Sequence, residues 1–316
     1  MREKPDGPLT REDFESADDY ARYCRESGIE AFRKKRYPSA WLTHGVGPNV
    51  DLMRAIHGAA EPEQLKAQAS WGVTKSINDR QFKNAYNAVA FANRNGRVMN
   101  VHMTIAWSTV GIVADEELAD LNEKFLERFR KWCDARELPR AWIFVLERSK
   151  ERGLHSHILA SVPRDGYADG KAGLTNWAKG CIKNLTGRVP LQKRGEKTKT
   201  IVVRHKDESV QLQWKWFRYV MKGLAPNLTR RDSEDRRKVR LLKNVAGVRA
   251  RPQGTVTTKR VGSSRVIGAK AREAAGFKSE LDNGATKARQ LYTDLYIQRF
   301  EMDEELRRME AKHRFF

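Results

Sequence analysis

The segment spanning residues 142–163 constrains the fold most strongly, because two apolar runs there flank a short polar loop at residues 148–153. This is the pattern of a β-hairpin, and therefore of an antiparallel sheet. Alternate side chains of a strand share a face, so His155 and His157 point the same way, about 6–7 Å apart along the strand. The hairpin thus presents two imidazoles side by side.

Two imidazoles in this arrangement are suited to binding a divalent metal ion. Glu147, on the preceding strand of the same hairpin, would add a carboxylate oxygen and complete a site open to a phosphate. The alternative is an incidental His-x-His pair with a structural role. The metal interpretation predicts a phosphodiester as the substrate.

The overall charge favours a polyanionic partner. Lys and Arg number 61 against 40 Asp and Glu, which gives a net charge of +21 and a pI near 10.0. DNA or RNA is the first candidate for such a surface. We find no apolar run long enough to span a membrane and no signal-peptide pattern, so we expect no membrane partner and a cytoplasmic location.

Apolar periodicity predicts an α+β fold with a central antiparallel sheet flanked by helices. The expected strands are residues 98–107, 141–147, 154–162 and 200–204, and the expected helices are residues 14–32, 64–70, 115–138, 174–185 and 209–224. We divide the chain into an N-terminal helical region of unknown role (1–95), a central domain (96–228) and a basic C-terminal region (229–316).

The helix at residues 209–224 carries a second candidate group. Its apolar positions, spaced by four, three and four, form one core-facing stripe of Val210, Trp214, Phe217 and Met221. Tyr219 lies nearly opposite that stripe, and Lys222 shares its face. A tyrosine phenol is almost wholly protonated at neutral pH, so attack on phosphorus needs a nearby cation or base, which Lys222 would supply. The alternative is an ordinary tyrosine that packs at the helix edge.

Three motifs in this order resemble those of the HUH endonucleases, specifically rolling-circle replication initiators of the Rep type from bacterial plasmids and phages. They are His-Met-Thr-Ile-Ala-Trp at residues 102–107, Leu-His-Ser-His-Ile-Leu at residues 154–159 and Tyr-Val-Met-Lys at residues 219–222. The resemblance covers residues 98–224.

The resemblance implies an antiparallel sheet flanked by helices and a metal centre in which His155 and His157 bind Mg²⁺ or Mn²⁺. Glu147 would be the third ligand, in preference to Glu151 in the loop. Tyr219 would cut one DNA strand in single-stranded or origin DNA, leaving a 5′-phosphotyrosine and a free 3′-hydroxyl. Lys222 would assist at the scissile phosphate. No phosphate-binding loop of a helicase is found, so a host helicase and a host polymerase would be partners in the bacterial cytoplasm.

Two features depart from the family pattern. Ser156, between the histidines, is small and polar where a bulky apolar residue is usual, so packing behind the ligand strand is expected to differ. A single tyrosine lies in the catalytic helix, which argues against a two-tyrosine cycle. The histidines precede the tyrosine, unlike in relaxases, while single-tyrosine HUH transposases share this order and remain an alternative.

The C-terminal region is rich in arginine, whose guanidinium groups bind phosphate bidentately. We predict that DNA is held by Arg230, Arg231, Arg236, Arg237, Lys238, Arg249, Arg251, Lys259 and Arg260. The alternative is a solvated charged face. Residues 289–314 are expected to form one charged helix with Leu291, Leu295, Met302 and Met309 inside.

Three classes of function are compatible with these observations. The first is a DNA-nicking and -joining enzyme. The second is a non-catalytic DNA-binding regulator of replication or transcription, and the third is a metal-dependent hydrolase of RNA or of a small phosphate.

Overall fold

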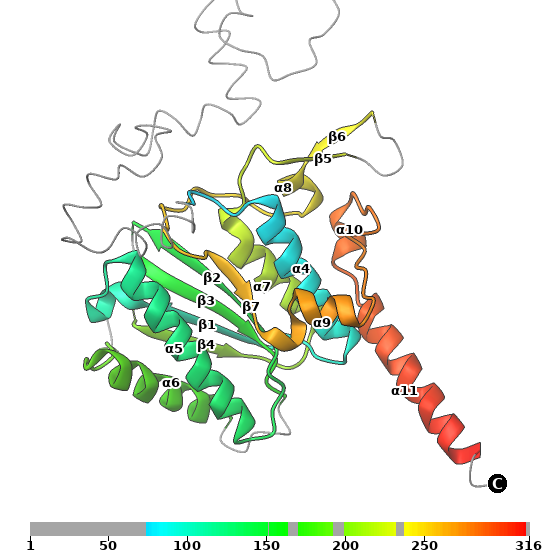
Figure 1. Ribbon diagram of the computed structural model, residues 1–316, viewed down its shortest axis with the longest axis horizontal. Coiled ribbons are helices and arrows are strands. Elements are labelled where there is room, and N and C mark those ends of the chain that lie inside the picture. Colours follow the sequence, from blue (N-terminus) through cyan, green and yellow to red (C-terminus); the bar gives the residue numbers. More distant parts are fainter. Residues whose placement is uncertain (1–73, 151, 164–169, 192–198, 232–236, 314–316) are drawn as a thin grey trace, which may run out of the picture. The chain divides into compact units, whose positions relative to one another are not determined.

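The computed structural model describes residues 74–150, 152–163, 170–191, 199–231 and 237–313. The helices expected at residues 14–32 and 64–70 lie outside these ranges. The described part is α+β, with a five-stranded antiparallel sheet flanked by helices (Figure 1). This confirms the predicted class of fold.

The sheet has the strand order β4-β1-β3-β2-β7, and every neighbouring pair is antiparallel. Its strands are β1 (Val101–Ala106), β2 (Trp142–Ser149), β3 (Gly153–Ala160), β4 (Ile201–His205) and β7 (Val261–Ser263). The hairpin predicted from the sequence is the β2–β3 pair. β5 (Thr229–Arg231) and β6 (Val239–Leu241) form a separate two-stranded sheet.

Helices cover both faces of the five-stranded sheet (Figure 1). On one face lie α5 (Asp115–Asp134) and α6 (Gly170–Thr186), which share a core with β1 side chains such as Met103. On the other lie α4 (Asp79–Arg94) and α7 (Val210–Val220), which pack on Val145 and Leu159. Since side chains alternate along a strand, residues 147, 155 and 157 face α4 and α7.

The helix expected at residues 209–224 is present as α7, and its amphipathic pattern explains which side faces the core. Ser209 caps it by accepting a hydrogen bond from the backbone N–H of Leu212 (3.2 Å). Trp214 and Phe217 are buried in the core, as their spacing predicts, and Tyr219 lies on the exposed side. α7 ends at Val220, and the short 3₁₀ helix η4 (Met221–Gly223) follows.

The expected boundaries at residues 95 and 228 do not correspond to breaks in packing. Tyr86 of α4 stacks on Trp214 of α7 at 5.4 Å and meets Tyr292 at 6.3 Å. Its hydroxyl donates to the carbonyl of Leu291 (2.7 Å). α4 and the C-terminal elements therefore share one core with the sheet.

The C-terminal region contains several short helices and one long one. They are α8 (Leu242–Val245), η5 (Arg265–Ile267), α9 (Ala269–Ala274), α10 (Ala288–Leu291) and α11 (Leu295–His313), while η3 (Trp107–Val110) follows β1. The single helix predicted at residues 289–314 is thus interrupted between α10 and α11. Of the apolar residues expected inside that helix, Leu291 is fully buried, whereas Met302 and Met309 are 63% and 45% exposed. None of the described helices is long and apolar enough to cross a membrane.

Candidate metal centre

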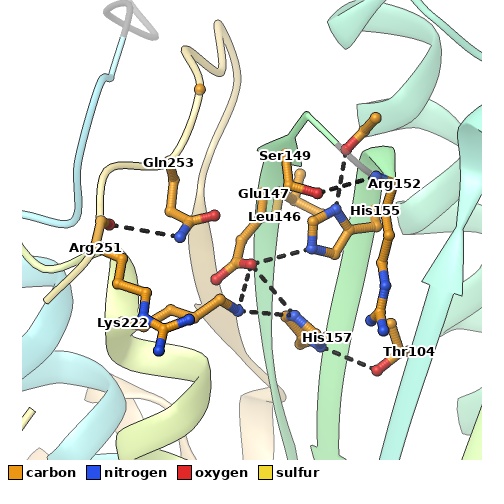
Figure 2. A network of polar contacts seen from close by, with 12 residues as sticks. Thr104, Leu146, Glu147, Ser149, Arg152, His155, His157, Lys222, Arg251 and Gln253 are labelled. Atoms are coloured by element: carbon orange, nitrogen blue, oxygen red, sulfur yellow. Dashed lines mark hydrogen bonds and ion pairs between the residues drawn. The ribbon is translucent and has the colours of Figure 1, made fainter. Parts of the chain in front are cut away.

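Strands β2 and β3 bring three candidate ligands together. Glu147 lies directly opposite His155 in the β2–β3 register, and His157 follows two residues later on the same face. All three side chains are buried, and one potential ligand atom from each lies within 4.8 Å of the others. The predicted grouping of a carboxylate with two imidazoles is therefore present (Figure 2).

The two imidazoles converge on one oxygen of the Glu147 carboxylate. Oε2 of Glu147 is 3.1 Å from Nε2 of His155 and 3.3 Å from Nε2 of His157. The other ring nitrogen of His155, Nδ1, lies 3.0 Å from the carbonyl oxygen of Gly153. Because a carbonyl can only accept, Nδ1 is the donor in this contact, and Nε2 is the ring nitrogen that faces Glu147 and would bind a metal ion.

His157 is supported from behind by β1. Its Nδ1 lies 3.1 Å from Oγ1 of Thr104 and 3.2 Å from Nε2 of His102. Thr104 is the residue that pairs with His157 across the β1–β3 ladder. Partners on Nδ1 orient an imidazole whose Nε2 binds metal. His102 and Thr104 belong to the first of the three motifs in the sequence, but the sequence alone assigns them no role at this centre.

The buried charges favour metal-binding protonation states. Burial alone would raise the pKa of Glu147, but its hydrogen bonds with His155 and His157 and the nearby charge of Lys222 hold it well below its usual range. Burial lowers the pKa of His157 to about 4, against the opposing effect of Glu147. At neutral pH the carboxylate is therefore anionic and the His157 imidazole neutral, as metal ligands must be.

One atom of the centre fits a cation in particular. Oε1 of Glu147 is buried and has no hydrogen-bond partner among the described residues. An anionic oxygen without a partner is costly to bury unless a cation or a donor compensates it. The donor set, two imidazole nitrogens and a carboxylate, suits a divalent ion that accepts mixed nitrogen and oxygen ligands.

Lys222 and Tyr219 lie beside these ligands. Nζ of Lys222 is 2.6 Å from Oε2 of Glu147 and 3.2 Å from Nε2 of His157 (Figure 2). The same nitrogen lies 4.3 Å from the ring centroid of Tyr219. The Tyr219 ring is 5.5 Å from that of His157 and 5.8 Å from that of His102, and the residue is 43% exposed. The tyrosine, lysine and histidine motifs thus meet at one place.

The predicted DNA-binding residues do not all lie on the surface. Exposed members of the set are Arg231, Arg237, Lys238, Arg249, Arg251 and Lys259. Arg230 is half-buried and donates to the carbonyl of Leu281, and Arg236 lies outside the described residues. Arg251 lies beside the centre, where its backbone N–H donates to the carbonyl of Lys222 (2.7 Å) (Figure 2).

Arg260 does not fit the prediction that it binds DNA. Its side chain is fully buried and donates to the carbonyls of Thr74 (2.6 Å) and Gly254 (2.7 Å). Burial lowers its pKa to about 10, so it is still charged at neutral pH. A guanidinium enclosed in this way joins three chain segments and does not meet a nucleic-acid backbone.

Comparison of the chain with protein-family models, with curated proteins and with solved structures gives no match. Assignment of a function therefore rests on the chemistry of the residues above.

Proposed function

We propose that this chain is a metal-dependent endonuclease of the HUH type that nicks and rejoins one DNA strand at a replication origin through Tyr219. One observation carries the proposal. A tyrosine ring and a lysine ammonium from α7 and η4 lie against a buried cluster of two histidines and a glutamate on β2 and β3. A structural tyrosine at a helix edge requires no such neighbours.

Glu147, His155 and His157 would hold Mg²⁺ or Mn²⁺, since carboxylate oxygen suits both ions. When bound, the ion supplies Lewis-acid polarisation of a phosphoryl oxygen. His102 and Thr104 keep the His157 ring in position through its Nδ1 atom.

The reaction is a transfer of the phosphoryl group to the phenol. The hydroxyl oxygen of Tyr219 forms a bond to phosphorus, and the bond from phosphorus to the 3′ oxygen of the preceding nucleotide breaks. The phenol gives its proton to solvent, and the departing oxygen gains one from solvent to become a free 3′-hydroxyl. Lys222 neutralises charge that builds on the phosphate. Attack of a 3′-hydroxyl on the phosphotyrosine reverses the step and rejoins the strand.

The charge of the chain supports nucleic acid as the substrate. A net charge of +21 attracts polyanions, and Arg251 exposes a guanidinium beside the centre. A 3′-hydroxyl left by the nick is a primer for a polymerase, so a host polymerase and a helicase are the expected partners.

A covalent-adduct assay tests the proposal. The protein is incubated with single-stranded DNA labelled at its 3′ end, the part that stays on the tyrosine, and with Mn²⁺, and is resolved on a denaturing gel. We expect a labelled protein band that is lost in Tyr219→Phe and with EDTA. Tyr292→Phe, which removes a phenol from the core, is the matched control and keeps the band. Cleavage without an adduct would instead indicate a hydrolase, and binding without cleavage a regulator.

A further inference from the structure

A pocket of about 520 Å³ lies away from the metal centre, where the C-terminal end of α4, the turn after α9 and α11 as far as Arg307 meet. Five cationic side chains and one carboxylate line it. They are Arg94, Arg97, Lys278, Arg299, Arg307 and Asp303. The excess of positive charge makes the pocket attractive to an anion.

Three of these cations are available to a ligand. Arg94 pairs with Asp303, and Arg307 pairs with Glu304 on its own helix. Arg97, Lys278 and Arg299 have no carboxylate partner within the described parts of the chain. A phosphate that entered the pocket would therefore find cations that no internal ion pair already neutralises.

Aromatic rings form another part of the pocket wall. Phe277 lies 5.2 Å from Phe91 and 5.7 Å from Tyr296, measured between ring centroids. Phe300 lies against Gly96, which has a left-handed φ of +68°, and a Cβ at that position would come within 2.4 Å of the Phe300 ring. These rings are held by packing, and rings next to free cations are the combination that binds nucleobases and phosphates of single strands.

We propose that this pocket is a second binding site for single-stranded DNA, which holds the strand at a distance from the scissile phosphate. The inference rests on the proposed function, since it assumes a DNA substrate. A concave site with aromatic walls takes unstacked nucleotides, whereas the bases of a duplex stay stacked.

α4 links the two sites. The residue just before its N-cap, Ile77, donates its backbone N–H to the carbonyl of Gly223, next to Lys222 (2.7 Å), and its last residue, Arg94, lines the pocket. A helix of 16 residues is about 24 Å long. Single-strand binders cover about 4–16 nucleotides per domain, enough for one strand to reach both ends of α4.

The test measures DNA affinity as a function of salt, in EDTA and with Tyr219→Phe as the parent protein, so that no cleavage interferes. The triple variant Arg97→Ala, Lys278→Ala and Arg299→Ala removes the free cations of the pocket. The matched control is Arg128→Ala, Lys131→Ala and Lys183→Ala, which removes the same charge from α5 and α6 on the other side of the sheet.

We expect the pocket variant to lower the log–log salt slope by about 2, because each phosphate contact of a single strand contributes about 0.7. The control should leave the slope unchanged. Phe300→Leu, which keeps an apolar side chain but removes the ring, should weaken binding about tenfold. Equal thermal midpoints of parent and variants verify that all of them are folded.

The outcomes separate the two proposals. Equal slopes in the pocket variant and in the control would overturn the second site while the covalent adduct of Tyr219 still supports the nickase. An equal loss of affinity for duplex and for single-stranded DNA would overturn the single-strand assignment. No DNA binding by the parent at low salt would overturn both.

Discussion

Nζ of Lys222 lies 2.6 Å from Oε2 of Glu147, and this is the oxygen that also meets Nε2 of His155 and Nε2 of His157. A lysine ammonium and a divalent cation held by these ligands would share one carboxylate oxygen and repel each other. The same ammonium faces the ring of Tyr219 at 4.3 Å. Lys222 is thus the counter-ion of the proposed metal ligand and the neighbour of the proposed nucleophile.

Replacing Lys222 by methionine should separate these two roles. We expect Lys222→Met to bind Mn²⁺ at least about tenfold more tightly, because a repelling charge is removed. Adduct formation should become about 100-fold slower, because charge on the phosphate is no longer neutralised. Calorimetric titration and single-turnover gels measure the two effects. Weaker Mn²⁺ binding in the variant would contradict the repulsion between the Lys222 ammonium and the bound ion.

Glu147 and Lys222 should also depend on each other for stability. Glu147→Gln leaves an ammonium that is only 15% exposed without its counter-ion, and should lower the free energy of unfolding by about 2 kcal/mol, less than the value for a fully buried pair. The double variant Glu147→Gln, Lys222→Met should recover most of this loss without recovering metal binding. Urea unfolding of all four proteins in EDTA gives the coupling energy, and additive losses would show that the two residues do not interact.

Much of the centre was predictable because it is encoded locally. Alternation along a strand puts His155 and His157 on one face, and a short hairpin loop fixes Glu147 opposite His155. Helical spacing likewise separates the buried stripe of α7 from Tyr219. These patterns need only neighbours within a few residues.

Other features depend on contacts between distant segments, which no local pattern specifies. His102 supports His157 only because β1 pairs with β3, and the ordering of strands is not visible in either strand alone. Arg260 meets Thr74, 186 positions away in the sequence. An arginine in a basic run has the same local pattern whether it is exposed or buried, so its enclosure could not be anticipated.

The buried histidines predict loss of stability in mild acid. Burial lowers the pKa of His102 to about 2, with His157 and Arg204 adding to the effect, and burial lowers that of His157 to about 4. In the unfolded chain both titrate near 6.5, so below that pH the unfolded state binds more protons and stability falls as the pH falls.

The expected loss is about 2 kcal/mol per histidine between pH 7.5 and pH 5, from the linkage of proton binding to unfolding. Glu147 adds to the loss of stability only when the pH falls below 4.5, the ordinary pKa of its carboxyl group. His102→Gln should roughly halve the dependence of the urea midpoint on pH above pH 5. Parallel curves for the wild type and this variant would mean that His102 is not held neutral by the fold.

Arg260 and Lys259 are adjacent and should behave in opposite ways. Arg260 is buried and bonds to the carbonyls of Thr74 and Gly254, whereas Lys259 is exposed. Arg260→Met should lower the free energy of unfolding by about 3 kcal/mol, because buried carbonyls lose a charged donor, and should leave the salt slope of DNA binding unchanged. Lys259→Met should leave stability unchanged and reduce that slope by about 0.7. A reduced slope in Arg260→Met would contradict its structural role.

Ser156, which departs from the bulky apolar residue expected between the histidines, is explained by the polar contacts on the other side of β3. Its Oγ accepts a hydrogen bond from Nε1 of Trp107 (2.7 Å) and donates to Oδ1 of Asn122 on α5 (2.9 Å). Ser156→Ala would leave two buried polar groups without a partner, so we expect a loss of about 2 kcal/mol in the free energy of unfolding.

Ser161 provides the matched control, because its Oγ is equally buried but has no hydrogen-bond partner among the described residues. Ser161→Ala should therefore change stability by less than about 0.5 kcal/mol. Since Ser156 lies between both histidine ligands and ties their strand to α5, Ser156→Ala should also weaken Mn²⁺ binding by about tenfold. Urea unfolding measures the stability of both variants, and Mn²⁺ titration measures their affinity for the ion. If the two alanine variants behave alike, the contacts of Ser156 do not hold the ligand strand in place.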